Sequence, residues 1–437
     1  RRTSAAILKK SAAKQCQLDP VPTWLVKRAS DVFAPIISRM CNASLDQSKL
    51  PVRCKRAIVR PLLKKQSFDP NDPSSYRPIS NLSFVSKIVE KVVDARISEH
   101  VAKNNLLPAH QSAYRPYHST ETAVICVLNN MINSIDQGHV GAIMLLDMSA
   151  AFDTVDHRIM LDVLSKRFGL QDEALNWLED FLTDRSQAIH NSATESDDIA
   201  LRFGVPQGSV IGPKGLIEYA EDVEGVFEKH QLHHHLFADD MQGLASGFLS
   251  SVPVIASTLT SCFTDVGTWC ASKRLQLNAS KTEVMWFGTA NGLRKLPAGS
   301  GCIYASSEIV KPVSVVRNLG VWIDAELTMR DQLSKTCQSC FFHLRRLRSI
   351  RKLLGRDVTI QLVCALVLSR LDYCNSVYAG LPAATLAPLQ RVLHAAACLV
   401  NDLKTSDHVT SALMNLHWLP IKQRVEYKLC CHVHNVS

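Results

Sequence analysis

Three aspartates occupy positions where their side chains could do chemistry. Asp147 ends a long apolar run in the segment LLDMSAAFD, and Asp239 and Asp240 are adjacent in the segment FADD. A carboxylate at the end of a buried strand costs free energy unless a partner compensates its charge. Two adjacent carboxylates beside a third would suit Mg²⁺, a hard cation that binds carboxylate and phosphate oxygens. Paired Mg²⁺ ions can activate a 3′-hydroxyl and hold the leaving oxygen, which is phosphoryl transfer on nucleotides.

The hydrophobic pattern predicts the elements that must position these aspartates. Residues 140–146 form a near-continuous apolar run, which is typical of a central strand buried on both faces. The segment HHHLFADDMQGLA predicts a β-hairpin with two aspartates at its tip, and LQLNASKTEVMWFG predicts a strand pair around a turn. Asp156 and Gly169 are candidate caps of the helix between them. From about residue 328 to the end the pattern is helical almost throughout.

Other segments add a strand and further helices. CKRAIVRPLLKK predicts a strand, and the Gly/Pro-rich turn RFGVPQGSVIGP leads into a helix expected near residues 216–228. Near the N-terminus, apolar residues at Trp24, Val32, Ile36 and Met40 have helical spacing, between proline breaks.

Composition narrows the class of protein. The chain has 437 residues, of which 46% are hydrophobic and 20% charged, which excludes a disordered chain. A formal net charge of +9 favours a polyanionic partner such as nucleic acid. No window reaches 18 consecutive apolar residues, so we expect no membrane span. The chain starts with Arg1 rather than Met, which we interpret as a fragment or a processed piece.

Cysteine and histidine clusters give weaker signals. The fourteen cysteines are scattered, which favours buried free thiols in a reducing compartment over disulfides. Cys337 and Cys340 form a C-x-x-C pair, but no second ligand pair lies nearby. The C-terminal CCHVH segment resembles the start of a zinc knuckle, and we favour a helix there. In the triplet 233–235 (HHH), strand alternation sends neighbours to opposite faces, which argues against a three-ligand site.

Eight segments, in this order, resemble the reverse transcriptase of non-LTR (LINE-type) retrotransposons. The similarity runs from about residue 18 to the end, and its order makes a chance match implausible. The segments are SYRPISNLSFVSKIVEKVV, HQSAYRPYHSTETAV, LLDMSAAFDTVDH, GVPQGSVIGP, HLFADDMQ, LQLNASKTEVMWFG, VRNLGVWIDAELTM and LVLSRLDYCNSVYAGLP.

The resemblance implies roles for the matching residues. The metal-binding catalytic carboxylates would be Asp147, Asp239 and Asp240, holding two Mg²⁺ ions, with Mn²⁺ as an alternative, and Lys281 would protonate the leaving pyrophosphate. Phe152 resembles a steric gate against a ribose 2′-hydroxyl, with core packing as the alternative interpretation. Nucleotide-binding residues would be Arg77, Arg115, Phe152, Gln207 and Gly208. Primer and template contacts would come from Asn318, Leu319, Gly320, Arg345, Arg348, Lys352 and Arg356.

The last four of these residues carry a separate structural expectation. Their spacing of three, four and four residues predicts one basic face of a single helix, either contacting the template–primer backbone or simply solvated.

The fold that the resemblance implies is an α+β right-hand polymerase with fingers, an antiparallel-sheet palm and a helical thumb. We expect an N-terminal helical segment over residues 1–44, fingers and palm over 45–325, and a thumb with a C-terminal extension over 326–437. The implied activity is RNA-directed DNA synthesis in target-primed reverse transcription. Its partners would be an RNA template, a DNA primer or target and dNTPs, in a ribonucleoprotein of the nucleus and cytoplasm. The oligomeric state stays open.

One segment departs from the family pattern. Where relatives are apolar after the GP of GVPQGSVIGP, this chain has Lys214, Gly215 and Glu218. Glycine inside a helix costs about 1 kcal/mol, and an unpaired buried charge costs several. An alternative hypothesis is therefore a decayed, inactive remnant that still binds nucleic acid. A third is a host-domesticated relative.

Overall fold

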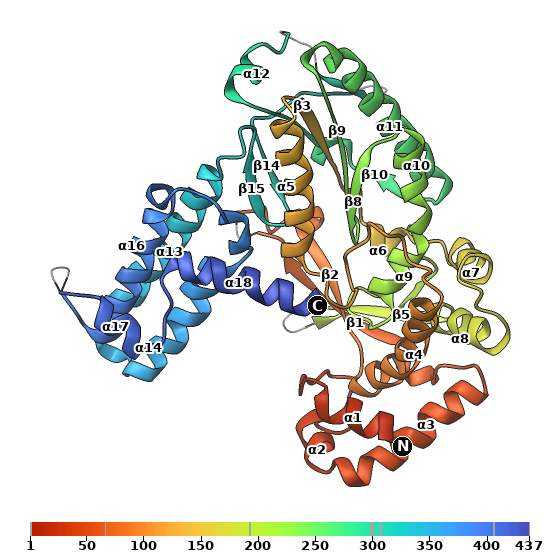
Figure 1. Cartoon of the computed structure of the whole chain (residues 1–437). Coiled ribbons are helices and arrows are strands. Elements are labelled where there is room, and N and C mark those ends of the chain that lie inside the picture. The colour runs from red at the N-terminus through yellow and green to blue at the C-terminus, as the bar shows by residue number, and fades with distance from the viewer. Residues whose placement is uncertain are drawn as a thin grey trace.

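The computed structural model describes residues 2–65, 67–191, 194–297, 301–305, 308–404 and 407–436. Figure 1 shows a central sheet flanked by helices, with N-terminal helices below it and a C-terminal lobe of helices to its left. The last helix, α18 (Ile421–Val436), runs from the C-terminal lobe back toward the centre of the molecule.

The central sheet is antiparallel and contains the predicted apolar strand. Its order is β11 (Glu283–Phe287), β3 (Val140–Leu146), β9 (Asp240–Gly247) and β8 (His233–Phe237). Ala142 and Met144 of β3 pack into one hydrophobic core, and Ile143 packs into the other. Helix α11 (Val252–Ser272) covers the first face of the sheet and α5 (Thr120–Asp136) covers the second (Figure 1). Because both faces are covered, β3 is apolar along its whole length, as predicted.

A second, mixed sheet lies between the central sheet and the N-terminal helices. Its strands are β2 (Tyr76–Asn81), β1 (Arg56–Leu63), β5 (Arg185–Asn191), β6 (Thr194–Glu195) and β7 (Ile199–Leu201). The predicted strand in CKRAIVRPLLKK is β1, which pairs antiparallel with β2 and parallel with β5. Helix α4 (Phe84–Lys103) follows β2 and begins at Ser83, whose hydroxyl accepts a hydrogen bond from the Ser86 amide.

The N-terminal segment is helical, as predicted, but the expected break at Pro35 is wrong because α3 continues through it, and the apolar spacing does not mark the buried face. The helices are α1 (Arg2–Lys10), α2 (Thr23–Arg28) and α3 (Ser30–Asp46). Trp24, Val32 and Ile36 are 54–65% exposed, whereas Ile37 and Cys41 of α3 are buried. Helix α3 is apolar on two sides, and its contacts with α1, α4 and α8 (Asp172–Leu182) determine which side is covered.

Short helices lie in the connections between strands. Besides α8 they are α6 (Ala151–Thr154), α7 (His157–Lys166), α9 (Gly212–Tyr219), α10 (Glu224–Lys229) and α12 (Ala290–Arg294). The Asp156 carboxylate caps α7 by accepting hydrogen bonds from the amides of Arg158 and Ile159, as predicted. The helix expected over 216–228 starts earlier, at Gly212, and a 3₁₀ turn divides it into α9 and α10.

Three two-stranded ladders complete the β-structure. They are β10 (Gln276–Leu277) with β4 (Met148–Ser149), β12 (Ile303–Ala305) with β13 (Glu308–Val310), and β14 (Val315–Asn318) with β15 (Val321–Asp324). The expectation that LQLNASKTEVMWFG forms a strand pair was wrong in its pairing. Both strands exist, but β10 pairs with β4 and β11 pairs with β3, because the turn between them carries the chain from one ladder to the other.

The C-terminal lobe is helical, as predicted. It contains α13 (Arg330–Ile350), α14 (Arg356–Val363), α15 (Ser369–Asp372), α16 (Ala383–Asn401), α17 (Thr410–Asn415) and α18, with a π-helical stretch over Cys364–Leu368. Among the described residues, α16 alone is long and apolar enough to cross a membrane by length and composition. In this fold Leu389, Val392 and Leu393 of α16 are fully buried in the core of the lobe.

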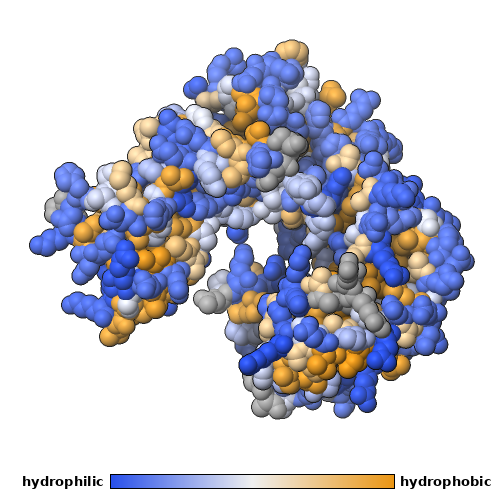
Figure 2. Space-filling view, turned by 60° about the horizontal axis from the view of Figure 1, so that its bottom comes forward, coloured by the Kyte–Doolittle hydropathy of each residue, from blue (hydrophilic) through white to orange (hydrophobic). Residues whose placement is uncertain are grey.

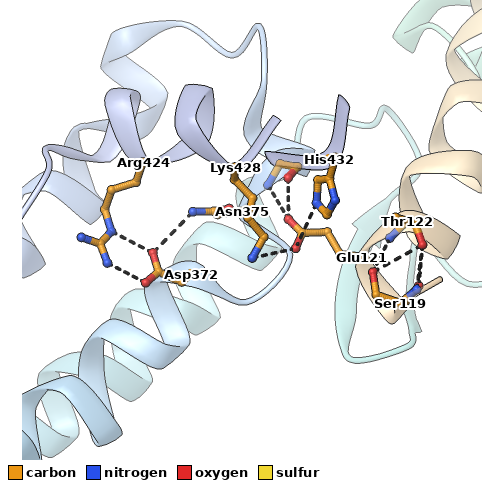
Figure 3. A network of polar contacts seen from close by, with 9 residues as sticks. Ser119, Glu121, Thr122, Asp372, Asn375, Arg424, Lys428 and His432 are labelled. Carbon is orange, nitrogen blue, oxygen red and sulfur yellow. Dashed lines mark hydrogen bonds and ion pairs between the residues drawn. The ribbon is translucent and has the colours of Figure 1, made fainter. Parts of the chain in front are cut away.

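A network of polar contacts attaches α18 to the start of α5 (Figure 3). The Glu121 carboxylate accepts hydrogen bonds from the amide and the hydroxyl of Ser376, and it lies 3.2 Å from Lys428 Nζ and 3.6 Å from His432 Nε2. Burial favours the neutral acid, but the Ser376 hydrogen bonds and the Lys428 ammonium hold the pKa of Glu121 below its usual value. Glu121 therefore joins the C-terminal lobe to a helix that packs on the central sheet.

Replacing Glu121 with glutamine is expected to lower the free energy of unfolding by about 1.5–3 kcal/mol at pH 7, the range for hydrogen bonds to charged groups. Because the folded-state pKa of Glu121 is lowered, its contribution is complete above pH 4.5, the usual value for glutamate, and is lost as the pH falls through the lower folded-state value. Denaturant unfolding at pH 7 and in acid measures both effects. Glu426→Gln, in an exposed α18 ion pair with Lys422, is the matched control and should change stability little.

Candidate functional site

Antiparallel register brings Asp147 beside the other two aspartates. Leu146 at the end of β3 lies opposite Met241 of β9 in the last pair of this ladder, so Asp147 follows β3 at the same end of the sheet where Asp240 begins β9. Residues opposite each other in an antiparallel pair have Cα atoms about 4.5–5.5 Å apart. Asp239 lies in the tight turn between β8 and β9, just after Ala238, which has a φ of 57°. The structure therefore brings together the three carboxylates that the sequence places 92 and 93 positions apart.

The three carboxylates disfavour one another's charged forms. Partial desolvation in the site, together with the charges of Asp239 and Asp147, raises the pKa of Asp240 to about 6. Desolvation and the charge of Asp147 also raise the pKa of Asp239, while the cationic Lys281 and Arg77 act in the opposite direction. This concentration of carboxylate oxygens is the donor set that hard divalent cations prefer, so the residues fit a magnesium site.

Lys281 is the cation closest to Asp147. Its Nζ lies 2.6 Å from Asp147 Oδ2, and it belongs to a 3₁₀ turn over Ala279–Lys281. The Asn278 amide donates to the backbone oxygen of Asp147, which fixes this turn beside the end of β3. Ladder β10–β4 continues the same attachment. The Lys281 ammonium thus lies where its positive charge offsets the negative charge of the carboxylates.

A turn from the GVPQGSV segment holds Phe152 in place. Phe152 lies in α6, its ring is half-buried against the core, and its backbone oxygen accepts a hydrogen bond from the Val205 amide. A Cβ on Gly204 would lie 2.7 Å from that oxygen, so only glycine permits this approach. The Phe152 ring therefore packs partly against the core, and its backbone is bonded to this turn.

The same turn is bonded to strand β2. Gln207 accepts a hydrogen bond from the Ser80 amide through its backbone oxygen, at 2.8 Å. Gly208 has a φ of 131°, and a Cβ there would lie 2.4 Å from the Ser80 oxygen. From the other side, the buried Glu90 carboxylate of α4 accepts a hydrogen bond from the Val210 amide at 2.6 Å. These contacts fix the turn against α4 and against β2, which is the strand that also carries Arg77.

The two predicted arginines differ in what they contact. Arg77 is exposed on β2, and its charge acts on the Asp239 carboxylate. Arg115 instead donates from Nη1 to the backbone oxygens of Pro108, Ala109 and Gln111. The structure therefore places Arg77 within electrostatic range of Asp239 and gives Arg115 a part in folding its own loop.

Gln111 is a site residue that the sequence interpretation missed. Its Oε1 accepts hydrogen bonds from the amides of Ala113 and Ala238, and Ala238 immediately precedes Asp239. The Ser112 amide also donates to the Leu236 backbone oxygen, so this loop adds to the edge of β8. The only signal for Gln111 was a polar residue inside the segment HQSAYRPYHST, which does not reveal a partner 127 positions away.

The predicted primer hairpin is attached to the central sheet by its asparagine. Asn318 is 3% exposed and exchanges two hydrogen bonds, of 2.8 and 2.9 Å, with Gln242 of β9. Leu319 and Gly320 form the tip with positive φ values of 44° and 88°, and Tyr373 Oη donates to the Leu319 oxygen. The buried Asn318 side chain positions the hairpin, and the half-exposed tip is the part that a ligand could reach.

The prediction that four basic residues share one face of a single helix was wrong. Arg345 and Arg348 lie on α13, but α13 ends at Ile350, Lys352 lies in a 3₁₀ turn and Arg356 begins α14. Arg351 stabilises the break between α13 and α14. Its guanidinium donates hydrogen bonds to the backbone oxygens of Leu354, Leu399 and Val400. All four basic residues are exposed, but they belong to three elements.

Figure 2 shows the molecule hollowed between the C-terminal lobe and the part nearest the viewer, with hydrophilic residues along the central side of the hollow and a mixture on the side of the lobe. A central antiparallel sheet with carboxylates at one end, a second sheet beside it and a helical lobe beyond it make up a right-hand polymerase fold. This fold, with three carboxylates converging at one end of its central sheet, is typical of template-directed polymerases.

Comparison with known proteins identifies the family. The family described as "Reverse transcriptase (RNA-dependent DNA polymerase)" matches residues 63–323, and the chain belongs to it. This match, together with relatives from mobile elements, confirms the resemblance to non-LTR retrotransposon enzymes and the fold class.

The relatives of this chain come from mobile elements. The chain is 27% identical over 358 residues to the probable RNA-directed DNA polymerase from transposon BS of Drosophila melanogaster, covering 75% of this chain and 38% of that protein. It is 24% identical over 320 residues to the RNA-directed DNA polymerase from mobile element jockey of the same species, covering 72% and 34%. The chain thus spans less than two fifths of the length of either relative. Apo telomerase from Candida tropicalis is similar to it with a TM-score of 0.47 and 11% identity, covering 87% of this chain and 69% of that one.

Proposed function

We propose that this chain synthesises DNA on an RNA template, adding dNTPs to a primer 3′-hydroxyl in target-primed reverse transcription. The observation that carries the proposal is the convergence of Asp147, Asp239 and Asp240, with Lys281 in contact with the first of them. Reverse transcriptases use divalent metal ions, and these carboxylates would hold a pair of Mg²⁺ ions, or Mn²⁺ in their place. Bound Mg²⁺ supplies Lewis-acid activation of the primer hydroxyl and neutralises phosphate charge.

The surrounding residues would bind and orient the substrates. Arg77 would grip the triphosphate, with Arg115 shaping the loop beside it, and Lys281 would hold at Nζ the proton that the pyrophosphate receives. The backbone of Gln207 and Gly208 would approach the incoming nucleotide, since the turn is fixed to β2 and no Cβ projects from Gly208.

The hairpin tip and the basic residues of the C-terminal lobe would hold the nucleic acid. We propose that the tip residues Leu319 and Gly320, positioned by Asn318, contact the primer, and that the C-terminal lobe contacts the template–primer backbone. The hydrophilic central side of the hollow in Figure 2 suits a sugar–phosphate backbone. The basic residues of that lobe are Arg345, Arg348, Lys352 and Arg356.

Two wider expectations stay proposals. The first is the division into an N-terminal segment over 1–44, fingers and palm over 45–325, and a thumb with extension over 326–437. The second is a ribonucleoprotein of the nucleus and cytoplasm, which the fourteen free cysteines support, since free thiols suit a reducing compartment.

The residues that suggested a decayed remnant are accommodated locally. Lys214 Nζ lies 2.8 Å from the Asp94 carboxylate, so its charge is paired. Burial raises the pKa of Glu218 to about 8, so its carboxyl is neutral at pH 7. A Cβ on Gly215 would lie 2.5 Å from the end of the Met160 side chain, so glycine lets α9 approach α7 closely. The remnant hypothesis is therefore not favoured.

Primer extension tests the activity directly. The purified chain, given an RNA template, an annealed DNA primer, dNTPs and Mg²⁺, should lengthen the primer, and chelation of Mg²⁺ should stop it. A protein that binds template–primer in a mobility-shift assay but never extends it, at any Mg²⁺ or Mn²⁺ concentration, would instead match the inactive remnant.

Phe152→Val is expected to increase the use of ribonucleotides relative to deoxynucleotides by about 10- to 100-fold, the range for a change of pocket volume. The smaller side chain leaves room for a 2′-hydroxyl, while extension with dNTPs continues. Single-nucleotide incorporation with each substrate measures the ratio. Phe203→Val, an aromatic residue 55% exposed near the same turn, is the control and should leave the ratio unchanged. If the ratio of ribonucleotide to deoxynucleotide use were unchanged in Phe152→Val, core packing alone would explain the presence of Phe152.

A further inference from the structure

A second cluster of ligand-type side chains lies apart from the aspartates, on the edge of the central sheet. His110 precedes the loop that adds to β8, His234 lies on β8, and Glu224 begins α10. One nitrogen from each histidine and one carboxylate oxygen lie within 4.8 Å of one another. His110 Nδ1 lies 2.6 Å and His234 Nε2 lies 3.0 Å from the same Glu224 Oε1. The two rings meet edge to face, with centroids 4.5 Å apart.

The surroundings of His234 leave a place for a cation. Its Nδ1 lies 3.1 Å from the backbone oxygen of Leu232, which can only accept a hydrogen bond, so the ring hydrogen belongs on Nδ1. In the neutral ring, Nε2 then presents a lone pair to the Glu224 carboxylate, which also presents lone pairs. The two atoms repel each other unless a proton or a metal ion lies between them. A histidine that donates from one nitrogen to a backbone oxygen and binds with the other has the usual arrangement of a metal ligand.

Burial favours a defined site with an open entrance. The side chain of His234 is 4% exposed and that of Glu224 is 14% exposed, while His110 is 50% exposed. Phe227 stacks on the His234 ring, with centroids 5.4 Å apart, and holds its orientation. Two ligands are therefore held by the fold, and the third faces solvent, from which an ion can enter.

We propose that His110, Glu224 and His234 bind one Zn²⁺ ion, separately from the aspartate site. Two imidazoles and one carboxylate, with a fourth position open to water, are a zinc donor set. Mg²⁺ prefers oxygen ligands only, so the two sites select different metals. The ion ties the loop after His110 to α10, and Gln111 of that loop supports the turn that carries Asp239. Zinc would therefore stabilise the edge of the sheet next to the catalytic turn.

Metal binding by the purified, chelator-treated chain tests the proposal without relying on polymerase activity. Calorimetric titration with Zn²⁺ should give one site that excess Mg²⁺ does not displace, together with a higher melting temperature. His110→Ala should weaken that site by more than about 100-fold, since changes outside the ligand shell already cost about 10- to 100-fold. His233→Ala is the matched control, because His233 is an exposed neighbour on the same strand whose side chain points to the other face.

Two further measurements separate this site from the alternatives. Glu224→Gln should weaken the site as His110→Ala does, and the circular dichroism of both variants shows that they fold. Bound Co²⁺ should lack a thiolate charge-transfer band, which excludes the fourteen cysteines as ligands. No zinc binding at neutral pH would mean that a proton, not a metal, lies between His234 and Glu224. A thiolate band, or unchanged binding in His110→Ala, would place the metal elsewhere; any of these results overturns the proposal.

Discussion

Replacing Asp239 with alanine is expected to reduce primer extension on an RNA template by at least about 10³-fold, with binding of template–primer retained. Loss of a metal-holding carboxylate removes several kcal/mol of transition-state stabilisation, and each 1.4 kcal/mol is about tenfold in rate. Single-turnover extension at saturating dNTP and Mg²⁺ measures the loss. Asp265→Ala, which removes a surface carboxylate paired with Lys229 and His230, is the control and should extend primers normally.

Stability measurements show whether such a loss comes from unfolding. The three carboxylates disfavour one another, and desolvation with the charge of Asp147 raises the pKa of Asp239. A carboxyl whose folded-state pKa is raised makes an unfavourable contribution when ionised, and that contribution disappears as the pH falls through the raised value. The metal-free Asp239→Ala protein should therefore unfold no more easily than the original at pH 7.5. Undiminished extension by this folded variant would contradict the proposed mechanism.

Gly208→Ala is expected to reduce extension by about 10²-fold, the effect of misplacing a reacting group by about 1 Å. Gly208 has a φ of 131°, which L side chains rarely adopt, and its Cβ would lie 2.4 Å from the backbone oxygen of Ser80. The turn must move off β2, which breaks the hydrogen bond from the Ser80 amide to Gln207. Because the turn is proposed to meet the incoming nucleotide, the KM for dNTP should rise together with the fall in kcat.

Gly267→Ala is the matched control for the same chemical change. Gly267 lies within α11, and a Cβ there would meet no atom within 4 Å. Alanine at this position should therefore raise the helix stability by up to about 1 kcal/mol and leave extension unchanged. If Gly208→Ala behaved like Gly267→Ala in both thermal unfolding and extension, the turn would have no part in placing the nucleotide.

Local patterns were enough to predict the core of the site. The apolar run before Asp147 identified a buried strand, and the FADD segment identified a hairpin. Both inferences rest on periodicity and turn preference, which depend on neighbouring residues. Antiparallel pairing of those two elements then brings Asp147 to the same end of the sheet as Asp240. The cap at Asp156 and the helical C-terminal lobe were predictable for the same local reasons.

Partners distant in the chain were not predictable. Gln111 drew no attention, but its Oε1 accepts a hydrogen bond from the Ala238 amide, 127 positions away. Asn318 looked like a primer contact, but its side chain is buried against Gln242. The charge of Lys214 looked uncompensated until α4 placed Asp94 beside it. In each case the polar group bonds to a group that folding brings close to it. The spacing of residues along the sequence does not reveal that partner.

The sequence by itself determined which segments form strands, turns and helices, and the order in which the carboxylates follow along the chain. These depend on short-range sterics, hydrogen bonding and the period of apolar residues. Only the tertiary structure decided which face of α3 is covered, where the basic residues divide among α13, the following turn and α14, and which two histidines meet at Glu224. These depend on which surfaces meet in space, because burial and polar pairing are satisfied by the nearest atoms rather than by neighbours in sequence.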